Sequence, residues 1–246
     1  PGFLHPLERT EPRKQSLPLH VTGLDVDDPD AACERLRLDR SVQPVDRFRG
    51  GQSEARRVFR AFLDQRLADY AAHRNQPQTD DVSCMSMYLH FGQVSPVWLA
   101  LELRETPGLE ESRDVFMEEL LVRRELAHNY THFEPDYDRY EALPGWARTT
   151  LREHAKDRRE PLYKAGELEG AETHDPYWNA AMREMRYTGY MHNYMRMYWG
   201  KKILEWSGTP EDAFSTALAL NNKYFIDGRD PNSYAGVAWV FGLHDR

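Results

Sequence analysis

Residues 175–206 read DPYWNAAMREMRYTGYMHNYMRMYWGKKILEW, and this stretch predicts the fold more strongly than any other part of the chain. Asp175 followed by Pro176 is typical of a helix start, because aspartate caps free backbone amides and proline fits the first helical turn. Apolar and aromatic side chains then recur at helical spacing on both sides of Gly189. A glycine at that point can end one helix before the next begins. We therefore expect two consecutive helices that are largely buried.

The same stretch carries residues that a plain helical core does not need. Two core helices rich in methionine and aromatic residues are the simplest interpretation. Arg196, Lys201 and Lys202 lie among the apolar residues, and Trp178 and Trp199 add large rings that can be oxidised. For the two lysines, a solvated helix face and a phosphate contact are equally consistent with the pattern. A functional site along these helices is therefore an alternative to a purely structural core.

Composition limits the classes of function. The chain has 246 residues, enough to bury a substantial core, with 32 basic and 40 acidic side chains and a formal charge of -8. This balance argues against a protein that coats nucleic acid non-specifically, but it permits a local basic cleft. With only Cys33 and Cys84, a disulfide framework is not expected and a reducing interior fits best. No apolar run is long enough to cross a bilayer and no signal peptide begins at Pro1. We expect an intracellular protein, in the cytoplasm of a prokaryote or the nucleus of a eukaryote.

Cap signals and periodicity predict further helices. Residues 1–48 are poor in apolar periodicity and are interpreted as a linker with one short helix near residues 30–38. Strand-like alternation is almost absent from the rest. We therefore expect an all-α protein in which residues 49–246 form one helical domain. Its other helices are expected after a Ser53 cap, after Ser95, from Ser112 or Asp114, over residues 146–156, and from Thr209 to about Asn221 or Asn222.

Three motifs give the chain a resemblance to a known family. TGYMHN at residues 188–193, followed by Arg196-Met197, is similar to the flavin-domain signature of the photolyase/cryptochrome family. ELLVRREL at 119–126 and NNKYFIDGRDP at 221–231 narrow the resemblance to the class II cyclobutane pyrimidine dimer (CPD) photolyases. The order and spacing of these motifs make the resemblance specific over residues 49–246. It implies a helical FAD-binding catalytic domain, here without the N-terminal α/β antenna domain of such proteins.

FAD is the cofactor that the resemblance implies. SCMS at residues 83–86 precedes an apolar run, a pattern that by itself indicates a helix start whose free amides also suit a pyrophosphate. The resemblance implies a buried ion pair between Arg196 and Asp227 beside the isoalloxazine ring. It implies Asn221 near the N5 atom of that ring in the manner of class II, whereas more distant family members have an asparagine after the Asp-Gly segment, a region that here reads Pro231-Asn232-Ser233. The other implied cofactor contacts are Tyr70, Val82, Ser83, Met85, Ser86, Phe116, Arg123, Gly228 and Arg229.

The implied activity is the light-driven repair of CPDs in DNA. Photoexcited, reduced FAD donates an electron to the dimer, the dimer splits, and the electron returns. Glu119 is implied as a hydrogen-bond partner of the extruded dimer. Glu119 and Arg123 also have the i,i+4 spacing of a plain surface ion pair. The other residues implied on the DNA side of the cleft are Arg74, Asn193, Met197 and Trp239.

The resemblance also implies a route by which electrons reach the flavin. Trp199 and Trp178 match a chain of tryptophans through which electrons hop, with Tyr198 as an auxiliary. The alternative for both tryptophans is a structural role in the core. His128 and His132 have the i,i+4 spacing of some metal ligands, but no third ligand lies nearby in the sequence, so no metal is expected.

We expect a monomer that acts on damaged DNA and not on a membrane. A cryptochrome-like photosensor, which binds FAD and signals without repair, is the first alternative, although Glu119 and the basic residues of the cleft favour repair. A helical DNA-binding module without a cofactor is the second, and it leaves the Arg196 and Asp227 matches as coincidence. A flavin absorption spectrum distinguishes this second alternative from the other two functions.

Overall fold

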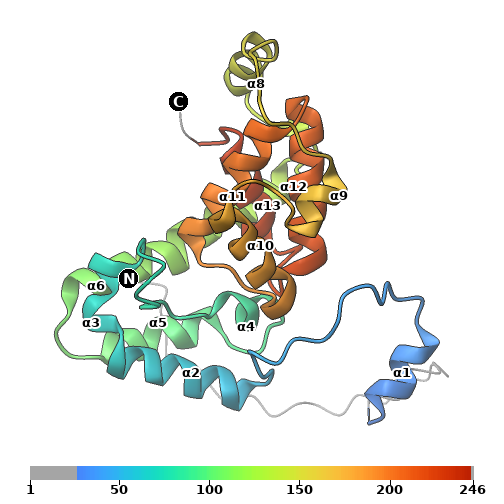
Figure 1. Cartoon of the computed structure of the whole chain (residues 1–246). Coiled ribbons are helices and arrows are strands. Elements are labelled where there is room, and N and C mark those ends of the chain that lie inside the picture. The colour runs from blue at the N-terminus through green and yellow to red at the C-terminus, as the bar shows by residue number, and fades with distance from the viewer. Residues whose placement is uncertain (1–26, 245–246) are drawn as a thin grey trace. The chain divides into compact units, whose positions relative to one another are not determined.

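The structure, a computed structural model, describes residues 27–244 of the chain. These residues contain helices and no β-strand, which confirms the all-α expectation (Figure 1). They fall into two compact units that divide between Pro44 and Val45. The first unit contains α1 (Pro29–Arg35), which is shorter than the helix expected near residues 30–38. Within the described range, no helix is both long and apolar enough to span a bilayer.

The second unit contains all the other helices of residues 27–244, in two groups that follow each other along the chain. The first group comprises α2 (Gln52–Gln65), α3 (Leu67–His73), α4 (Ser86–His90), α5 (Pro96–Glu105), α6 (Glu110–Met117), the π-helical segment η1 (Glu118–Arg123) and α7 (Arg124–Phe133). The second group comprises the short 3₁₀ segment η2 (Tyr140–Ala142), α8 (Gly145–Glu153), α9 (Ala165–Gly170), α10 (Pro176–Thr188), α11 (Asn193–Trp206), α12 (Pro210–Tyr224) and α13 (Pro231–Val240).

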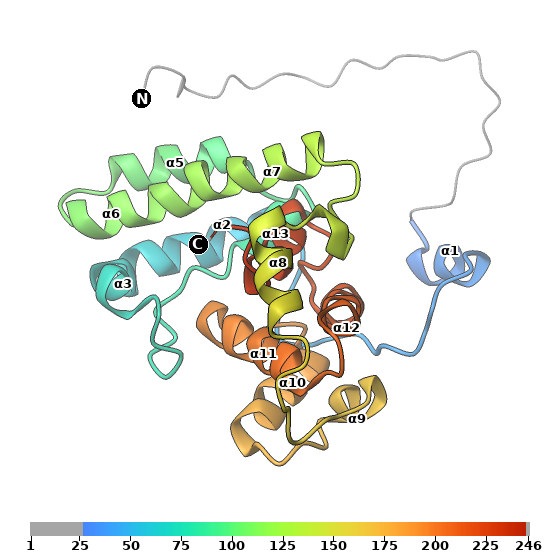
Figure 2. The ribbon, with the colours of Figure 1, turned by 90° about the horizontal axis from the view of Figure 1, so that it is seen from above.

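Helix α13 connects the two groups in space. It packs along α7 of the first group and against α11 and α12 of the second. Within the first group, α3 packs against α6, and Figure 2 shows α5 beside the nearly continuous helix formed by α6, η1 and α7. Within the second group, α11 packs against both α10 and α12. A site next to α13 can therefore draw residues from both groups.

The two helices predicted from residues 175–206 are present as α10 and α11. Asp175 Oδ1 accepts hydrogen bonds from the backbone N–H groups of Tyr177 and Trp178, at 2.9 and 3.0 Å, and so caps α10. Gly189 ends α10 in the left-handed conformation, with φ of 66°. A Cβ atom at Gly189 would lie 2.4 Å from the side chain of Ile226. Glycine is required there by both the backbone conformation and the close contact.

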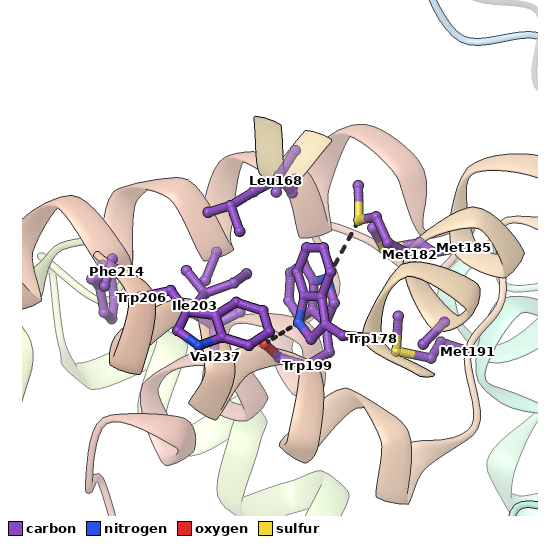
Figure 3. Close-up of a cluster of buried hydrophobic side chains, with 14 of the residues drawn as sticks. Leu168, Trp178, Met182, Met185, Met191, Trp199, Ile203, Trp206, Phe214 and Val237 are labelled. Atoms are coloured by element: carbon purple, nitrogen blue, oxygen red, sulfur yellow. Dashed lines mark hydrogen bonds between the residues drawn. The ribbon is translucent and has the colours of Figure 1, made fainter. Parts of the chain in front are cut away.

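The apolar side chains of these helices meet in one buried cluster (Figure 3). Trp178, Met182 and Met185 of α10 pack there with Trp199 and Ile203 of α11. Full burial of one such side chain contributes about 1.5–3 kcal/mol to folding. The methionine and aromatic pattern therefore does build a core. Trp199 belongs to this core and also lines the functional site described below.

Two predicted helix starts are wrong. Gly51, and not Ser53, precedes α2, and its φ of 111° is one that side-chain-bearing residues rarely adopt. Ser53 lies inside the helix and does not cap it. Helix α6 begins at Glu110, before Ser112. The Ser112 hydroxyl instead accepts a hydrogen bond from the backbone N–H of Ala71 at 3.1 Å, which ties α6 to α3.

Other helix limits also differ from the predictions. The helix expected over residues 146–156 ends at Glu153, and the helix expected to end at Asn221 or Asn222 continues to Tyr224. The helix that runs through Phe116 is interrupted by η1, whose wider turn accommodates one residue more than an α-helical turn. This extra residue changes which side chains of η1 face the functional site.

Candidate functional site

A pocket of about 700 Å³ lies in the second unit, between residues of the first helix group and residues of α11, α12 and α13. Its walls come from segments that are far apart in the sequence. A separate hollow along α2 shares no residue with it. The predicted site residues that line the pocket are Tyr70, Arg74, Val82, Ser83, Met85, Ser86, Phe116, Glu119, Arg123, Asn193, Arg196, Met197, Trp199, Asn221, Asp227 and Trp239.

Arg196 and Asp227 form the most buried ion pair of the pocket. Two parallel contacts join them, from Nη1 to Oδ1 at 3.0 Å and from Nη2 to Oδ2 at 3.1 Å. Arg196 Nε also donates to the backbone oxygen of Met191, and its guanidinium lies 3.9 Å from the ring centre of Phe225. Burial alone raises the pKa of the Asp227 carboxyl, but Arg196 and the Ser86 hydroxyl outweigh it and hold that pKa below its usual value. The pair therefore presents a fixed, oriented cation to the pocket.

The segment from Val82 to Ser86, the first residue of α4, forms another wall. Val82, Ser83, Met85 and Ser86 all line the pocket, and Cys84 between them has a left-handed φ of 55°. Burial raises the pKa of the Cys84 thiol, so this cysteine stays protonated at neutral pH. Within the described residues no side chain caps α4, and the Ser86 hydroxyl interacts with Asp227 instead. The serines therefore do not act as the helix caps that their position suggested.

Glu119 and Arg123 do not form the i,i+4 pair that their spacing permits. Glu119 Oε1 lies 2.7 Å from Nη2 of Arg74, the residue directly after α3, whereas Arg123 Nε lies 3.4 Å from Glu118 Oε1. The Arg123 guanidinium also lies 5.6 Å from the ring centre of Trp239. The pocket therefore has a second carboxylate, besides Asp227, that a cation from another segment holds in place, and Arg123 and Trp239 also line the pocket.

Asn221 lies at the end of the pocket formed by α12 and α13. Its Nδ2 atom donates to Ser233 Oγ at 2.6 Å and to Asn222 Oδ1 at 3.0 Å. Asn222 Oδ1 also accepts a hydrogen bond from the backbone N–H of Arg229 at 3.1 Å. This set of contacts involves Asn222 and Ser233, which sequence reasoning did not assign, and it depends on the loop between α12 and α13.

The predicted electron-transfer residues divide between the pocket and the core behind it. Trp199 lines the pocket, and Trp178 lies behind it, fully buried, with its indole ring 5.6 Å from that of Trp206. Tyr198 donates its phenolic hydrogen bond to Asp175 Oδ2, away from the pocket lining. Burial together with the Asp175 carboxylate raises the pKa of Tyr198 to about 12. Tyr198 is therefore a protonated phenol with a carboxylate acceptor in place.

Gly228 and Arg229 lie in the α12–α13 loop and do not line the pocket. A Cβ atom at Gly228 would lie 2.9 Å from the backbone oxygens of Asn221 and Phe225, so glycine permits a close approach of two chain segments. Sequence reasoning missed pocket residues such as Tyr190 and Phe225. Tyr190 lies inside the TGYMHN motif, and that motif was the available signal.

In the described part of the chain, one group of possible metal ligands lies close together, formed by Asp69, His73 and Asp81. His128 and His132 do not belong to it. His73 Nδ1 already contacts Asp81 Oδ2 at 2.7 Å, as in an ordinary histidine–carboxylate pair. The group lies outside the lining of the pocket.

The chain was compared with known proteins. No protein-family model matches it. It is 49% identical over 244 residues to the deoxyribodipyrimidine photo-lyase of Methanothermobacter thermautotrophicus, an alignment that covers 99% of this chain and 53% of that protein. The chain belongs to the DNA photolyase family. This confirms the family predicted from the TGYMHN, ELLVRREL and NNKYFIDGRDP motifs.

Other photolyases agree with this assignment. The chain is 50% identical over 188 residues to the deoxyribodipyrimidine photo-lyase of Oryza sativa, covering 75% of this chain and 37% of that protein. It is 43% identical over 213 residues to that of Potorous tridactylus, covering 86% of this chain and 40% of that protein. The chain thus spans about half, or less, of the length of these photolyases.

A solved photolyase structure has the same fold. It is a bacterial class III photolyase from Agrobacterium tumefaciens, 23% identical, with a TM-score of 0.61 over 79% of this chain and 39% of that chain. At this identity the likeness concerns the fold alone. It supports the helical photolyase architecture of the second unit.

Proposed function

We propose that this chain is the FAD-binding catalytic part of a class II CPD photolyase, which repairs pyrimidine dimers in DNA with light. One observation carries the proposal: the three family motifs, far apart in the sequence, meet at one pocket of about 700 Å³. Pockets of roughly 300–1,000 Å³ are typical of cofactor and ligand sites. Class II in particular is supported by the ELLVRREL and NNKYFIDGRDP motifs, which supply Glu119, Asn221 and Asp227 to the walls.

The residues present fit FAD. Arg196, oriented by Asp227, offers a cation for the electron-rich edge of the ring system, and the Asn221 amide offers a polar contact nearby. Ser83, in the segment before α4, offers a hydroxyl to the phosphates, and Ser86, the first residue of α4, lines the pocket with its hydroxyl at Asp227. Phe116 and Tyr70 give the pocket an aromatic wall. Bound, reduced FAD would supply a donor that light excites, while these residues bind it, orient it and exclude water.

The mouth of the pocket fits an extruded pyrimidine dimer. Glu119 offers an acceptor carboxylate that Arg74 holds in place, while Met197 and Trp239 offer apolar surface to the bases. Arg123 lies beside Trp239 and adds positive charge for the DNA backbone. Extrusion costs less for a damaged, poorly stacked dimer than for an intact step. We therefore propose damaged DNA as the partner, with the protein acting inside the cell as a monomer.

The aromatic residues between the pocket and the core are suited to supplying electrons to the flavin. Trp199 forms part of the pocket wall, and Trp178 continues inward from it. Tyr198 has Asp175 as a proton acceptor, which would ease the oxidation of its phenol. We propose that Trp199 and Trp178 pass electrons to the flavin, with Tyr198 as an auxiliary donor.

Repair of dimer-containing DNA tests the proposal directly. The purified chain, loaded with FAD and chemically reduced, is mixed with an oligonucleotide that carries one thymine dimer and is exposed to blue light. We expect the dimer to disappear in the light and to persist in a dark control. A bound flavin without repair at any light dose would contradict repair and favour the photosensor alternative. A chain that binds no flavin would contradict both functions and leave a cofactor-free DNA-binding module.

A further inference from the structure

The contacts around Asn222 determine which way its side-chain amide points. The backbone N–H of Arg229 donates to Asn222 at 3.1 Å. A backbone N–H is only a donor, so the atom of Asn222 that faces it is the oxygen Oδ1. Amide orientation in a protein is assigned from its hydrogen-bond partners, and here the partner leaves one choice.

The orientation of Asn222 then determines that of Asn221. The same Asn222 Oδ1 atom faces the Asn221 amide at 3.0 Å, and an oxygen acceptor requires the Asn221 nitrogen opposite it. The second N–H bond of that nitrogen is directed to Ser233 Oγ at 2.6 Å. Both N–H bonds of Asn221 are thus used inside the protein. For a ligand in the pocket, which Asn221 lines, only the oxygen Oδ1 remains.

We propose that Ser233 and Asn222 are positioning residues that lock the Asn221 amide as a hydrogen-bond acceptor toward the pocket. The ligand that such a site prefers carries an N–H donor at that point. The proposal rests on the proposed function: reduced flavin carries a hydrogen on N5, whereas oxidised flavin has a lone pair there. An acceptor fixed in place therefore stabilises the reduced cofactor and not the oxidised one.

The hydrogen bonds that fix the orientation of the Asn221 amide, here called the lock, form within the protein and do not require a ligand. Asn221 and Ser233 are both almost fully buried, at 4% and 6% exposure, so water does not readily replace their mutual hydrogen bond. Gly228 lets the α12–α13 loop approach the end of α12, which brings Arg229 to Asn222. Loss of the Ser233 hydroxyl would free one N–H bond of Asn221 and permit the amide to turn.

Three serine variants test the lock in the flavin-loaded chain. Ser233→Ala removes the acceptor, and Ser233→Thr keeps a hydroxyl. Ser207→Ala is the matched control, because Ser207 is equally buried and bonds to Ile203 O at 2.7 Å, outside the pocket. The readouts are the reduction potential of the bound flavin and the rate at which air oxidises it.

We expect Ser233→Ala to lower the reduction potential and to speed oxidation by about two- to tenfold, the effect of one hydrogen bond. Ser233→Thr should restore the parental values, and Ser207→Ala should leave them unchanged. Asn222→Ala, at a less buried position, removes the other acceptor and should shift the potential in the same direction. The proposal is overturned if Ser233→Ala and Asn222→Ala both keep the reduction potential and the oxidation rate of the parent.

A measurement without flavin separates this proposal from the proposed function. In a chain labelled with ¹⁵N-asparagine, the side-chain amide signal of Asn221 is identified by its loss in Asn221→Gln. We expect its protons to exchange with D₂O at least about five times faster in Ser233→Ala than in the parent, because one hydrogen bond is lost. Equal exchange rates would show that the amide is not locked, whether or not the chain binds flavin. A chain that shows the lock but binds no flavin would contradict only the proposed function.

Discussion

The indole Nε1 of Trp178 donates a hydrogen bond to the backbone oxygen of Trp199 at 3.0 Å, and this bond connects the two tryptophans proposed for electron transfer. It depends on the side chain of Trp178 but only on the backbone of Trp199. The Trp199 indole has a weaker partner, the sulfur of Met182 at 3.4 Å (Figure 3). The Trp199 side chain can therefore be changed without leaving a strong buried acceptor unsatisfied.

Trp199→Phe is expected to block the light-driven reduction of oxidised flavin while sparing repair by chemically reduced protein. Phenylalanine is much harder to oxidise than tryptophan, but it keeps an aromatic body in the core, so we expect a stability loss of only about 1–2 kcal/mol. The measurement is flavin absorbance under blue light with an external reductant. Trp98→Phe, outside the pocket, serves as control and should photoreduce as the parent does. If Trp199→Phe is photoreduced normally, Trp199 has a structural role in the core and no role in electron transfer.

Glu119→Ala is expected to retain flavin and to weaken repair. A dimer at the mouth of the pocket would lose a polar partner, which corresponds to about 1–3 kcal/mol in binding or in the barrier. The neighbouring Glu118→Ala is the matched control, since Glu118 contacts Arg123 and does not line the pocket. Repair yield per absorbed photon and affinity for damaged DNA are the measurements. The assignment of Glu119 fails if both values equal those of the control.

Asp227→Asn is expected to change how stability depends on pH. The folded-state pKa of Asp227 is depressed, so its contribution is complete above the unfolded-state pKa of about 3.9 and is lost as pH falls through the lower folded value. At pH 7 the variant should be about 3–5 kcal/mol less stable, because Arg196 loses its buried partner. Urea unfolding at pH 7, 4 and 3 should show this difference shrinking only below about pH 4.

The exposed pair of Asp157 and His154 supplies the control for this experiment. Asp157→Asn should change stability little at pH 7, since exposed ion pairs contribute little. A difference between parent and Asp227→Asn that stays constant from pH 7 to pH 3 would show that folding does not lower the pKa of Asp227, and would contradict the expectation.

Gly228→Ala is expected to disturb the end of the pocket near Asn221. The added Cβ would lie 2.9 Å from the backbone oxygens of Asn221 and Phe225, which cannot move independently of α12. We expect a stability loss of about 1–3 kcal/mol together with weaker flavin retention. Gly166→Ala in α9, with nothing within 4 Å of its added Cβ, should not destabilise the protein. Urea unfolding and flavin content after gel filtration are the measurements, and parental values of both for Gly228→Ala would contradict the expectation.

The parts of the fold that were predicted correctly depend on local signals. Asp175 before Pro176 caps α10, Gly189 ends it, and Thr209 caps α12, all within a few residues of the chain. The failures have non-local causes. Ser112 stands in a good position for a cap, but its hydroxyl bonds to Ala71 on another helix. Sequence pattern alone does not reveal such a competing partner.

At the site, too, local motifs were informative and contacts between distant segments were not predicted. The motifs carried enough information to place Arg196 and Asp227 together, and the structure shows the pair with two parallel contacts. The pairing of Glu119 with Arg74 was not predicted, because it joins the residue that follows α3 to η1 across the first helix group. The contact of Asn221 with Ser233 was missed because it depends on how the α12–α13 loop folds back. Sequence reasoning named residues that line the pocket more often than it named their hydrogen-bond and ion-pair partners.

The wide turn of η1 makes this part of the chain sensitive to length. An α-helix advances about 100° per residue, so one residue more or fewer rotates everything after it by that angle. Helix α7 follows η1 directly, and it packs along α13. A one-residue deletion within η1 would therefore turn the buried side of α7, which includes Ala127, away from α13. The register of a whole helix interface thus depends on a single inserted residue, and this segment should tolerate substitutions far better than changes in length.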